Sequence, residues 1–283
     1  MLGIALAFLL IYFALGPLSQ AVLGPLGSEL RGKELADALA STRQAVIASA
    51  AGIVAAIGLL VTAQTYRASK RSQEVDRFAR AVTMLGSEKQ SERIGGLLTI
   101  EHIIDERRPE ARAGTEAIIA FITERAVSDP DELRESKLSP NPQWGDPGNE
   151  VPSDVKTALW ILGHNYPLPK RFMMDLSETD LRGAGLAGSK FPGTKFFYCQ
   201  LQGASFVGGD LKHCRLDGSS LVGAWLERVD LRRATLRNVD LRGANLRGAE
   251  IDARQLASAI IDDSTILDDE LVAKLRELRE SQS

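Results

Sequence analysis

Residues 240–251 read DLRGANLRGAEI, in which a large apolar residue returns at every fifth position. The same position is filled without interruption from Leu176 to Ile251, which gives sixteen five-residue units. A small or medium-sized residue stands two places before each large one, and nine units carry glycine two places after it. A period of five fits neither the roughly 3.6 residues of a helical turn nor the two of a strand. The pattern therefore predicts a chain that turns a corner after every five residues.

The arrangement within one unit follows from this period. The large residue and the small residue two places earlier lie on the same side of an extended segment, so both can point to the axis of a coil. The other three positions then face water. Glycine falls at the corner, where a backbone with few steric limits is useful.

These units resemble the pentapeptide-repeat family, whose consensus is A(D/N)LXX; TDLRGAGL at Thr179 to Leu186 is a second close match. The resemblance implies a right-handed quadrilateral β-helix with four units per coil. Sixteen units then give about four coils, roughly 20 Å long. We assign residues 171–256 to this solenoid. Residues 257–283 resemble the helical cap that shields the last coil, whose open edge would otherwise invite aggregation.

Two uncharged apolar runs near the N-terminus predict a transmembrane helical hairpin. The runs cover about residues 2–20 and 44–66, and a short polar loop from Glu29 to Arg43 joins them within residues 1–66. The first run could instead be a cleaved signal, and the second a buried soluble helix. Five basic residues follow the second run and three lie in the loop, which predicts that both termini are cytoplasmic. Ala48, Gly52 and Ala56 form a row of small residues that would permit a homodimer.

An α-helical domain is predicted between the membrane segment and the repeats. It comprises residues 67–127, a linker at 128–152 and a helix at 153–170 that leads into the solenoid. The expected helices run from Ser91 to Arg107, from Thr115 to Ala126 and from Asp154 to Leu162. FARAVTMLGSEKQSERIGGLLTIEHI and SDVKTALWILG resemble bacterial pentapeptide-repeat proteins with a membrane segment. That resemblance implies a multi-pass protein of the bacterial cytoplasmic membrane, and the fold class is α plus β-solenoid.

No catalytic, cofactor or metal site is predicted. The 283 residues are 44% hydrophobic and 25% charged with a net charge of −3, which excludes wholesale disorder. No constellation of cysteines or carboxylates accompanies His102, His164 or His213, and His102, next to Glu101 on a predicted helix, is expected at the surface and not in a metal site. Cys199 and Cys214 fall at the inward small position, so we expect buried thiols. We therefore expect a protein that is not an enzyme.

The charge of the solenoid bears on partners. The resemblance implies one well-known activity, the mimicry of DNA to bind gyrase, which needs a strongly negative face. Residues 172–251 instead hold nine acidic and eleven basic side chains, so we expect neither that role nor a nucleic-acid partner.

Seven outward side chains are candidate contacts to a protein partner or to lipid headgroups. Arg232, Arg237, Arg242 and Arg247 take the same position on four successive faces and form a girdle of positive charge, unless they serve only solubility. Phe197, Tyr198 and Trp225 are the outward aromatic residues. The predicted function is a membrane-anchored, non-enzymatic scaffold with an unidentified protein partner; the alternative is a regulatory subunit of a membrane channel or transporter.

Overall fold

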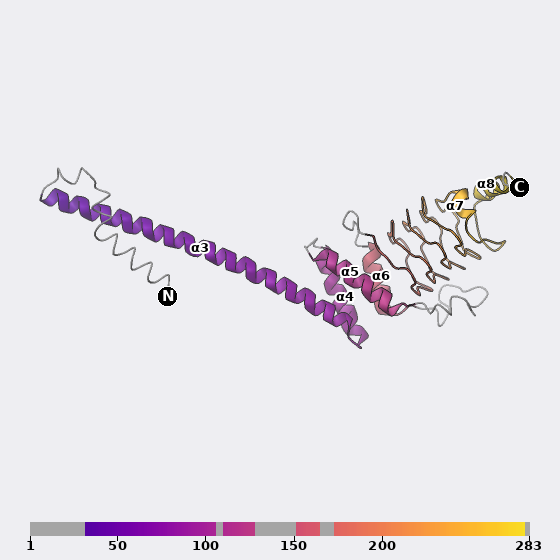
Figure 1. The fold of residues 1–283 in the computed structure, drawn as a ribbon, viewed down its shortest axis with the longest axis horizontal. Helices are drawn as coiled ribbons and strands as arrows, with labels where there is room; N and C mark the ends of the chain where they lie inside the picture. The colour runs from indigo at the N-terminus through magenta and orange to yellow at the C-terminus, as the bar shows by residue number, and fades with distance from the viewer. Residues whose placement is uncertain (1–31, 106–109, 128–150, 165–172, 281–283) are drawn as a thin grey trace. The chain divides into compact units, whose positions relative to one another are not determined.

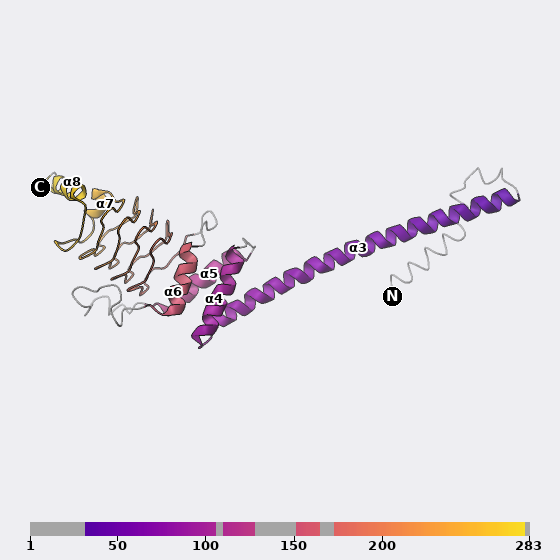
Figure 2. The ribbon, with the colours of Figure 1, turned by 180° about the vertical axis from the view of Figure 1, so that it is seen from behind.

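The computed structural model describes residues 32–105, 110–127, 151–164 and 173–280 (Figures 1 and 2). The chain divides into two compact units, Met1–Val75 and Asp76–Ser283, which are described separately. The predicted first apolar span and nearly all of the predicted linker lie outside the described residues. The hairpin prediction therefore stays a prediction.

Helix α3 extends from Lys33 to Leu85 and contains the whole second apolar run. By length and composition it is the one helix among the described residues that is apolar enough to cross a membrane. The loop predicted for residues 29–43 is wrong from Lys33 onward, because that part is helical. Its residues are mostly good helix formers, and Gly32, with a φ of 64°, is the last glycine before the helix begins.

Three short helices and the end of α3 pack together in the C-terminal unit. They are α4 (Gln90–Asp105), α5 (Ala111–Arg125) and α6 (Ser153–His164). Each presents an apolar side that is fully buried, for example Leu97, Ile118 and Leu159. The last turns of α3 contribute Ala81 and Leu85 to the same core. Val75, Phe78, Val82 and Leu85 recur at the spacing of one helix face, but only Leu85 is buried and Phe78 half-buried, whereas Val75 and Val82 are exposed.

A buried ion pair joins two of these helices. The Nε of Arg93, near the start of α4, lies 2.6 Å from Oδ2 of Asp154 in the first turn of α6. Arg93 also donates to the carbonyl oxygens of Ser87 and Glu88, which follow the end of α3. One side chain therefore connects the segment after α3 with α4 and α6.

The repeats fold into a solenoid of the kind that the five-residue period predicts. Parallel bridges join residues twenty positions apart, from Asp175 with Lys195 to Asp230 with Glu250, so one coil takes twenty residues and has four faces. The bridges are single residues, and no longer strand occurs in the described part of the chain. The large residues and the small ones before them fill the interior, where Phe191, Phe196 and Phe206 pack edge to face.

The corners confirm the role expected for glycine. All fifteen corner positions from 178 to 248 have a positive φ. Nine are glycines, with φ of 64–73°, and six carry side chains, with φ of 54–60°: Glu178, Tyr198, His213, Arg228, Arg233 and Asn238. The corner geometry is therefore set by the repeat and not by glycine alone.

Both ends of the solenoid are covered. At the first coil, the amide of Lys190 donates to the carbonyl of Gly163 in α6, and the amide of Asp180 donates to Ala126 after α5. At the other end lie α7 (Ala253–Leu256) and α8 (Asp269–Glu280), as Figures 1 and 2 show. The predicted cap at 257–283 is not a single helix, because Ile260 and Ile266 still form bridges to the coil before them.

Candidate functional site

The four faces of the solenoid provide its outward side chains, at the positions directly before and after each large residue. We name each face after one of its central buried residues. The Phe196 face is centred on Leu176, Phe196, Leu216 and Leu236, and the Leu201 face on Leu181, Leu201, Leu221 and Leu241. The Phe206 face is centred on Leu186, Phe206, Leu226 and Leu246, and the Leu211 face on Phe191, Leu211, Leu231 and Ile251.

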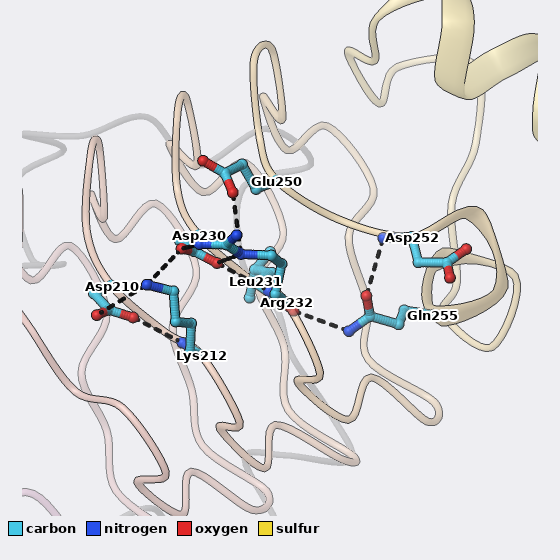
Figure 3. A network of polar contacts seen from close by, with 8 residues as sticks. All are labelled: Asp210, Lys212, Asp230, Leu231, Arg232, Glu250, Asp252 and Gln255. Carbon is cyan, nitrogen blue, oxygen red and sulfur yellow. Dashed lines mark hydrogen bonds and ion pairs between the residues drawn. The ribbon is translucent and has the colours of Figure 1, made fainter.

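The Leu211 face carries a ladder of alternating charges (Figure 3). Lys212 Nζ lies 3.7 Å from Asp210 and 2.9 Å from Asp230, and Arg232 lies 2.7 Å from Asp230 and 3.1 Å from Glu250. The hydrogen bond from Arg232 is the main reason that the pKa of Asp230 lies far below its ordinary value. These five side chains therefore pair with one another across three coils, whereas Lys190 on the same face forms no ion pair with a described residue.

The Leu201 face shows the same internal pairing. Arg182 pairs with Asp180, and Arg242 Nη2 lies 2.6 Å from Asp240 Oδ2. In each pair the aspartate also accepts the backbone amide of its arginine. The aspartate is thereby held in place two residues before its partner, on the same outward side.

The Phe196 face differs from these two faces because three of its arginines have no carboxylate partner; on the Phe206 face, Arg247 and the corner residue Arg228 also form no ion pair with a described residue. Arg215 and Arg237 lie on the face itself and Arg233 lies at the corner that leads into it; all three are exposed and none forms an ion pair with a described residue. Arg215 is bridged to Lys195 in the preceding coil, which places two cations in one column.

The Phe196 face has two carboxylates beside its large residues, Asp175 and Asp217, and both are engaged; a third, Glu178, is exposed at the corner one coil before Tyr198. Lys195 Nζ lies 2.9 Å from Asp175 Oδ2. Partial burial raises the pKa of Asp175, but hydrogen bonds from Ser177 and Lys195 outweigh it and hold that pKa below its ordinary value. Asp217 accepts from the Thr235 hydroxyl at 2.7 Å and from the backbone amide of Arg237 at 2.8 Å. Among the described residues, neither carboxylate forms an ion pair with the guanidinium group of Arg215 or Arg237.

Two aromatic side chains lie on the same face as these arginines. Tyr198 is 57% exposed and occupies a corner with a φ of 54°. Its ring lies against Gly218 of the next coil, where an added Cβ would approach Cε1 to 2.5 Å. Phe197, the preceding residue, is half-buried. The Phe196 face thus combines uncompensated cations with exposed aromatic surface.

The predicted contact residues are therefore only partly brought together. Phe197, Tyr198 and Arg237 share the Phe196 face, and Trp225, 43% exposed, shares the Phe206 face with Arg247. The arginines of the predicted girdle do point outward from four faces, but Arg232 and Arg242 are neutralised by aspartates. Sequence analysis missed Lys195, Arg215 and Arg233, although the spacing of twenty between Lys195 and Arg215 was a usable signal.

The histidines and cysteines form no common site. Among the described residues, no group of three or more His, Cys, Asp or Glu side chains could hold a metal ion. Both cysteines are buried, and burial raises the pKa of Cys199 to about 11 and of Cys214 to about 12. Their thiols donate to the carbonyls of Leu176 and Phe191 in the preceding coil.

Solved structures with a likeness to this chain include three repeat-bearing proteins. A pentapeptide repeat protein from Nostoc Pcc 7120 is 28% identical over 36% of this chain and 83% of its own, with a TM-score of 0.22. One from the Arabidopsis thaliana thylakoid lumen is 21% identical over 33% and 74%, with a TM-score of 0.22. QnrB1, a plasmid-mediated fluoroquinolone resistance protein, is 15% identical over 38% and 67%, also with a TM-score of 0.22. No curated protein matches the sequence.

The family comparison concerns the repeats directly. A family model described as pentapeptide repeats matches in eight copies, over residues 175–212, 194–233 and 214–251. These ranges cover the coils whose bridges are spaced by twenty residues. Residues 175–251, which form the β-helix, therefore belong to the pentapeptide-repeat family.

Proposed function

We propose that this chain is a membrane-anchored, non-enzymatic scaffold that displays a β-helix of about four coils on the cytoplasmic side of a bacterial inner membrane. The observation that carries the proposal is the continuity of α3. One helix includes the uncharged stretch at 44–66 and ends with Ala81 and Leu85 in the core of the C-terminal unit.

The uncharged stretch has the dimensions of a membrane span. Its 23 residues correspond to about 34 Å of helix, and the hydrocarbon core of a bilayer is ~30 Å thick. Its large apolar side chains are exposed, with Leu59 at 74% and Leu60 at 64%. Water would solvate such a surface poorly, whereas lipid tails would cover it. Ala48, Gly52 and Ala56 are exposed as well, so the proposed homodimer would have its small-residue row available.

The charges of the solenoid favour a scaffold over a DNA mimic. A DNA mimic must present carboxylates that are free to replace phosphates. Here Asp180, Asp230 and Asp240 are paired with arginines of their own units, which leaves their faces nearly neutral.

Alkaline carbonate extraction of bacterial membranes tests the anchor. We expect the full-length chain to stay in the membrane pellet. A variant with Ile57→Lys and Leu60→Lys, made together with its control in a chain without residues 2–20, should be released, because each lysine at the centre of a span costs ~3 kcal/mol on insertion and the predicted first span can no longer hold the chain. Val75→Lys with Val82→Lys, two exposed positions of the same helix beyond the uncharged stretch, is the matched control and should stay in the pellet.

Two results would contradict the anchor. Release of the unaltered chain by carbonate would show that the chain does not span the membrane, and an intact mass showing cleavage C-terminal to residue 66 would make the stretch a signal sequence. Affinity purification in mild detergent then separates the proposed scaffold from the alternative role, a regulatory subunit of a membrane channel or transporter. Partners kept by the lysine variant would indicate a scaffold, whereas partners lost with the apolar surface would indicate a subunit of a membrane complex.

A further inference from the structure

The solenoid distributes its uncompensated positive charge unevenly. Each arginine on the Leu201 and Leu211 faces has an aspartate two residues before it and pairs with it. On the Phe196 face the order is reversed, since Arg215 comes two residues before Asp217. Asp217 accepts from Thr235 and from the amide of Arg237, and it forms no ion pair with Arg215.

Arg233 adds a conformational argument. Its φ of 60° lies in the left-handed region, which costs roughly 1–2 kcal/mol for a residue with a Cβ. Glycine occupies nine of the fifteen corners and would avoid that cost. Arg233 forms no ion pair with a described residue that would compensate for it. Arg228, with a φ of 55°, is in the same situation at another corner; of the two, Arg233 is the one that borders the Phe196 face, where an external partner would explain it.

We propose that the basic face, defined as Lys195, Phe197, Tyr198, Arg215, Arg233 and Arg237, binds an acidic polypeptide segment of a partner protein. The proposal supplies the partner chemistry of the scaffold and rests on that proposed function. Charge complementarity selects carboxylates. Each of the three arginines without an ion-pair partner can donate two parallel hydrogen bonds to one carboxylate group. Tyrosine and arginine are also the residues that contribute most at protein interfaces.

A polypeptide fits this face better than a nucleic acid does. Asp175 and Asp217 lie among the cations, where they would repel a continuous phosphate backbone. A protein segment can place carboxylates opposite Arg215 and Arg237 and neutral side chains opposite the two aspartates. Its apolar side chains would pack against Tyr198 and Phe197.

The test measures binding of a fluorescent peptide of about twelve residues that alternates glutamate and serine, using the full-length chain in mild detergent. We expect fluorescence anisotropy at low salt to show saturable binding, which weakens as salt screens exposed charges. The variant R215Q/R237Q should bind roughly tenfold more weakly, since each exposed pair contributes up to ~1 kcal/mol. R182Q/R242Q removes the same net charge from the Leu201 face and should change affinity less than about twofold.

Control measurements keep the outcome decisive. All four substituted side chains are surface residues, and a far-ultraviolet circular dichroism spectrum shows whether each variant keeps its solenoid. An equal loss in both double variants would overturn the proposal, because it would indicate net charge and not a face. Tighter binding of oligothymidylate or of phosphatidylserine vesicles than of the peptide would also overturn it, in favour of another class of partner.

The membrane proposal can fail without affecting this result. Binding is measured in detergent, so it does not depend on insertion, and carbonate extraction reports on insertion alone. If the chain is not membrane-anchored but binds the peptide through Arg215 and Arg237, the basic face stands and the anchor falls. If it is anchored but R215Q/R237Q binds as the unaltered chain does, the basic face falls.

Discussion

Replacing one glycine by alanine should have opposite effects at two positions of the solenoid. Gly208 is a corner with a φ of +65°, and Gly185 is a bridge position without a positive φ; an added Cβ would meet no atom within 4 Å at either. Neither substitution introduces a clash with a neighbouring residue, so the two differ only in the backbone conformation that alanine must adopt. In the folded state, alanine in the left-handed region costs roughly 1–2 kcal/mol. In the unfolded state, alanine has less conformational freedom than glycine, which stabilises the fold by ~0.4–1 kcal/mol at either position. Gly208→Ala should destabilise by about 1 kcal/mol, and Gly185→Ala should stabilise by about 0.5 kcal/mol.

Guanidinium unfolding of the full-length chain in detergent, followed by circular dichroism, measures both changes. The reciprocal substitution Arg233→Gly should raise the unfolding midpoint, because it relieves the left-handed strain at a corner. If Gly208→Ala is as harmless as Gly185→Ala, the corner is not left-handed and the argument from fifteen positive φ values fails. If Arg233→Gly lowers stability, the arginine has an internal role, and the strain argument for the basic face fails with it.

Three further predictions concern buried and paired groups. Asp154→Ala should destabilise the C-terminal unit by about 3–5 kcal/mol, because it leaves Arg93 buried without its partner; Arg93→Met with Asp154→Leu should cost less in the same denaturation assay. Cys199 and Cys214 should resist Ellman's reagent at mildly alkaline pH in the native chain and react after unfolding, since burial raises both pKa values; rapid native reaction would contradict their burial. Asp230 has a depressed pKa in the folded state, so its stabilising effect is complete above its unfolded pKa of about 4 and is lost as the pH falls below it. Asp230→Asn should flatten the acid limb of a stability-against-pH curve; an unchanged limb would mean that the pair with Arg232 contributes nothing.

The solenoid could be predicted from sequence because its period constrains every unit at once. A large residue at each fifth position leaves one inward side, and nine glycines at one position identify the corner. The same register assigns a positive φ to Glu178 and Arg228, which no propensity would place there. The conformational preference of the residue type gave the wrong φ at Glu178 and Arg228, and their position in the repeat gave the correct one.

The ion pairs of the outward surface could also have been predicted, because residues two positions apart in an extended segment lie on the same side. If positions two apart share the inward side, the residues before and after the large one share the outward side. Asp-Leu-Arg or Asp-Leu-Lys then predicts a pair wherever it occurs, as at Asp230 with Arg232. Order matters, because an aspartate in the first position also accepts the amide of the third residue.

The course of α3 was harder to predict. Charged residues at 29–43 suggested a loop, but charge does not end a helix, and the stretch from Lys33 to Ala51 contains neither glycine nor proline; even Gly52 and Gly58 lie inside α3. The contacts between α4 and α6 were out of reach for another reason. Arg93 and Asp154 are 61 residues apart, and no local pattern indicates that a charged residue on each helix is buried.

The separation between core and surface gives the basic face its significance. The inward residues of the solenoid determine the coil, whereas substitutions at exposed outward positions usually change stability by no more than ~0.5 kcal/mol. All four Asp-Leu-Arg or Asp-Leu-Lys units fall on the Leu201 and Leu211 faces, and the Phe196 face has none. Stability of the coil does not require this difference, because all four faces are built on the same buried pattern. The difference therefore concerns what each face presents to other molecules, and the Phe196 face presents arginine and tyrosine.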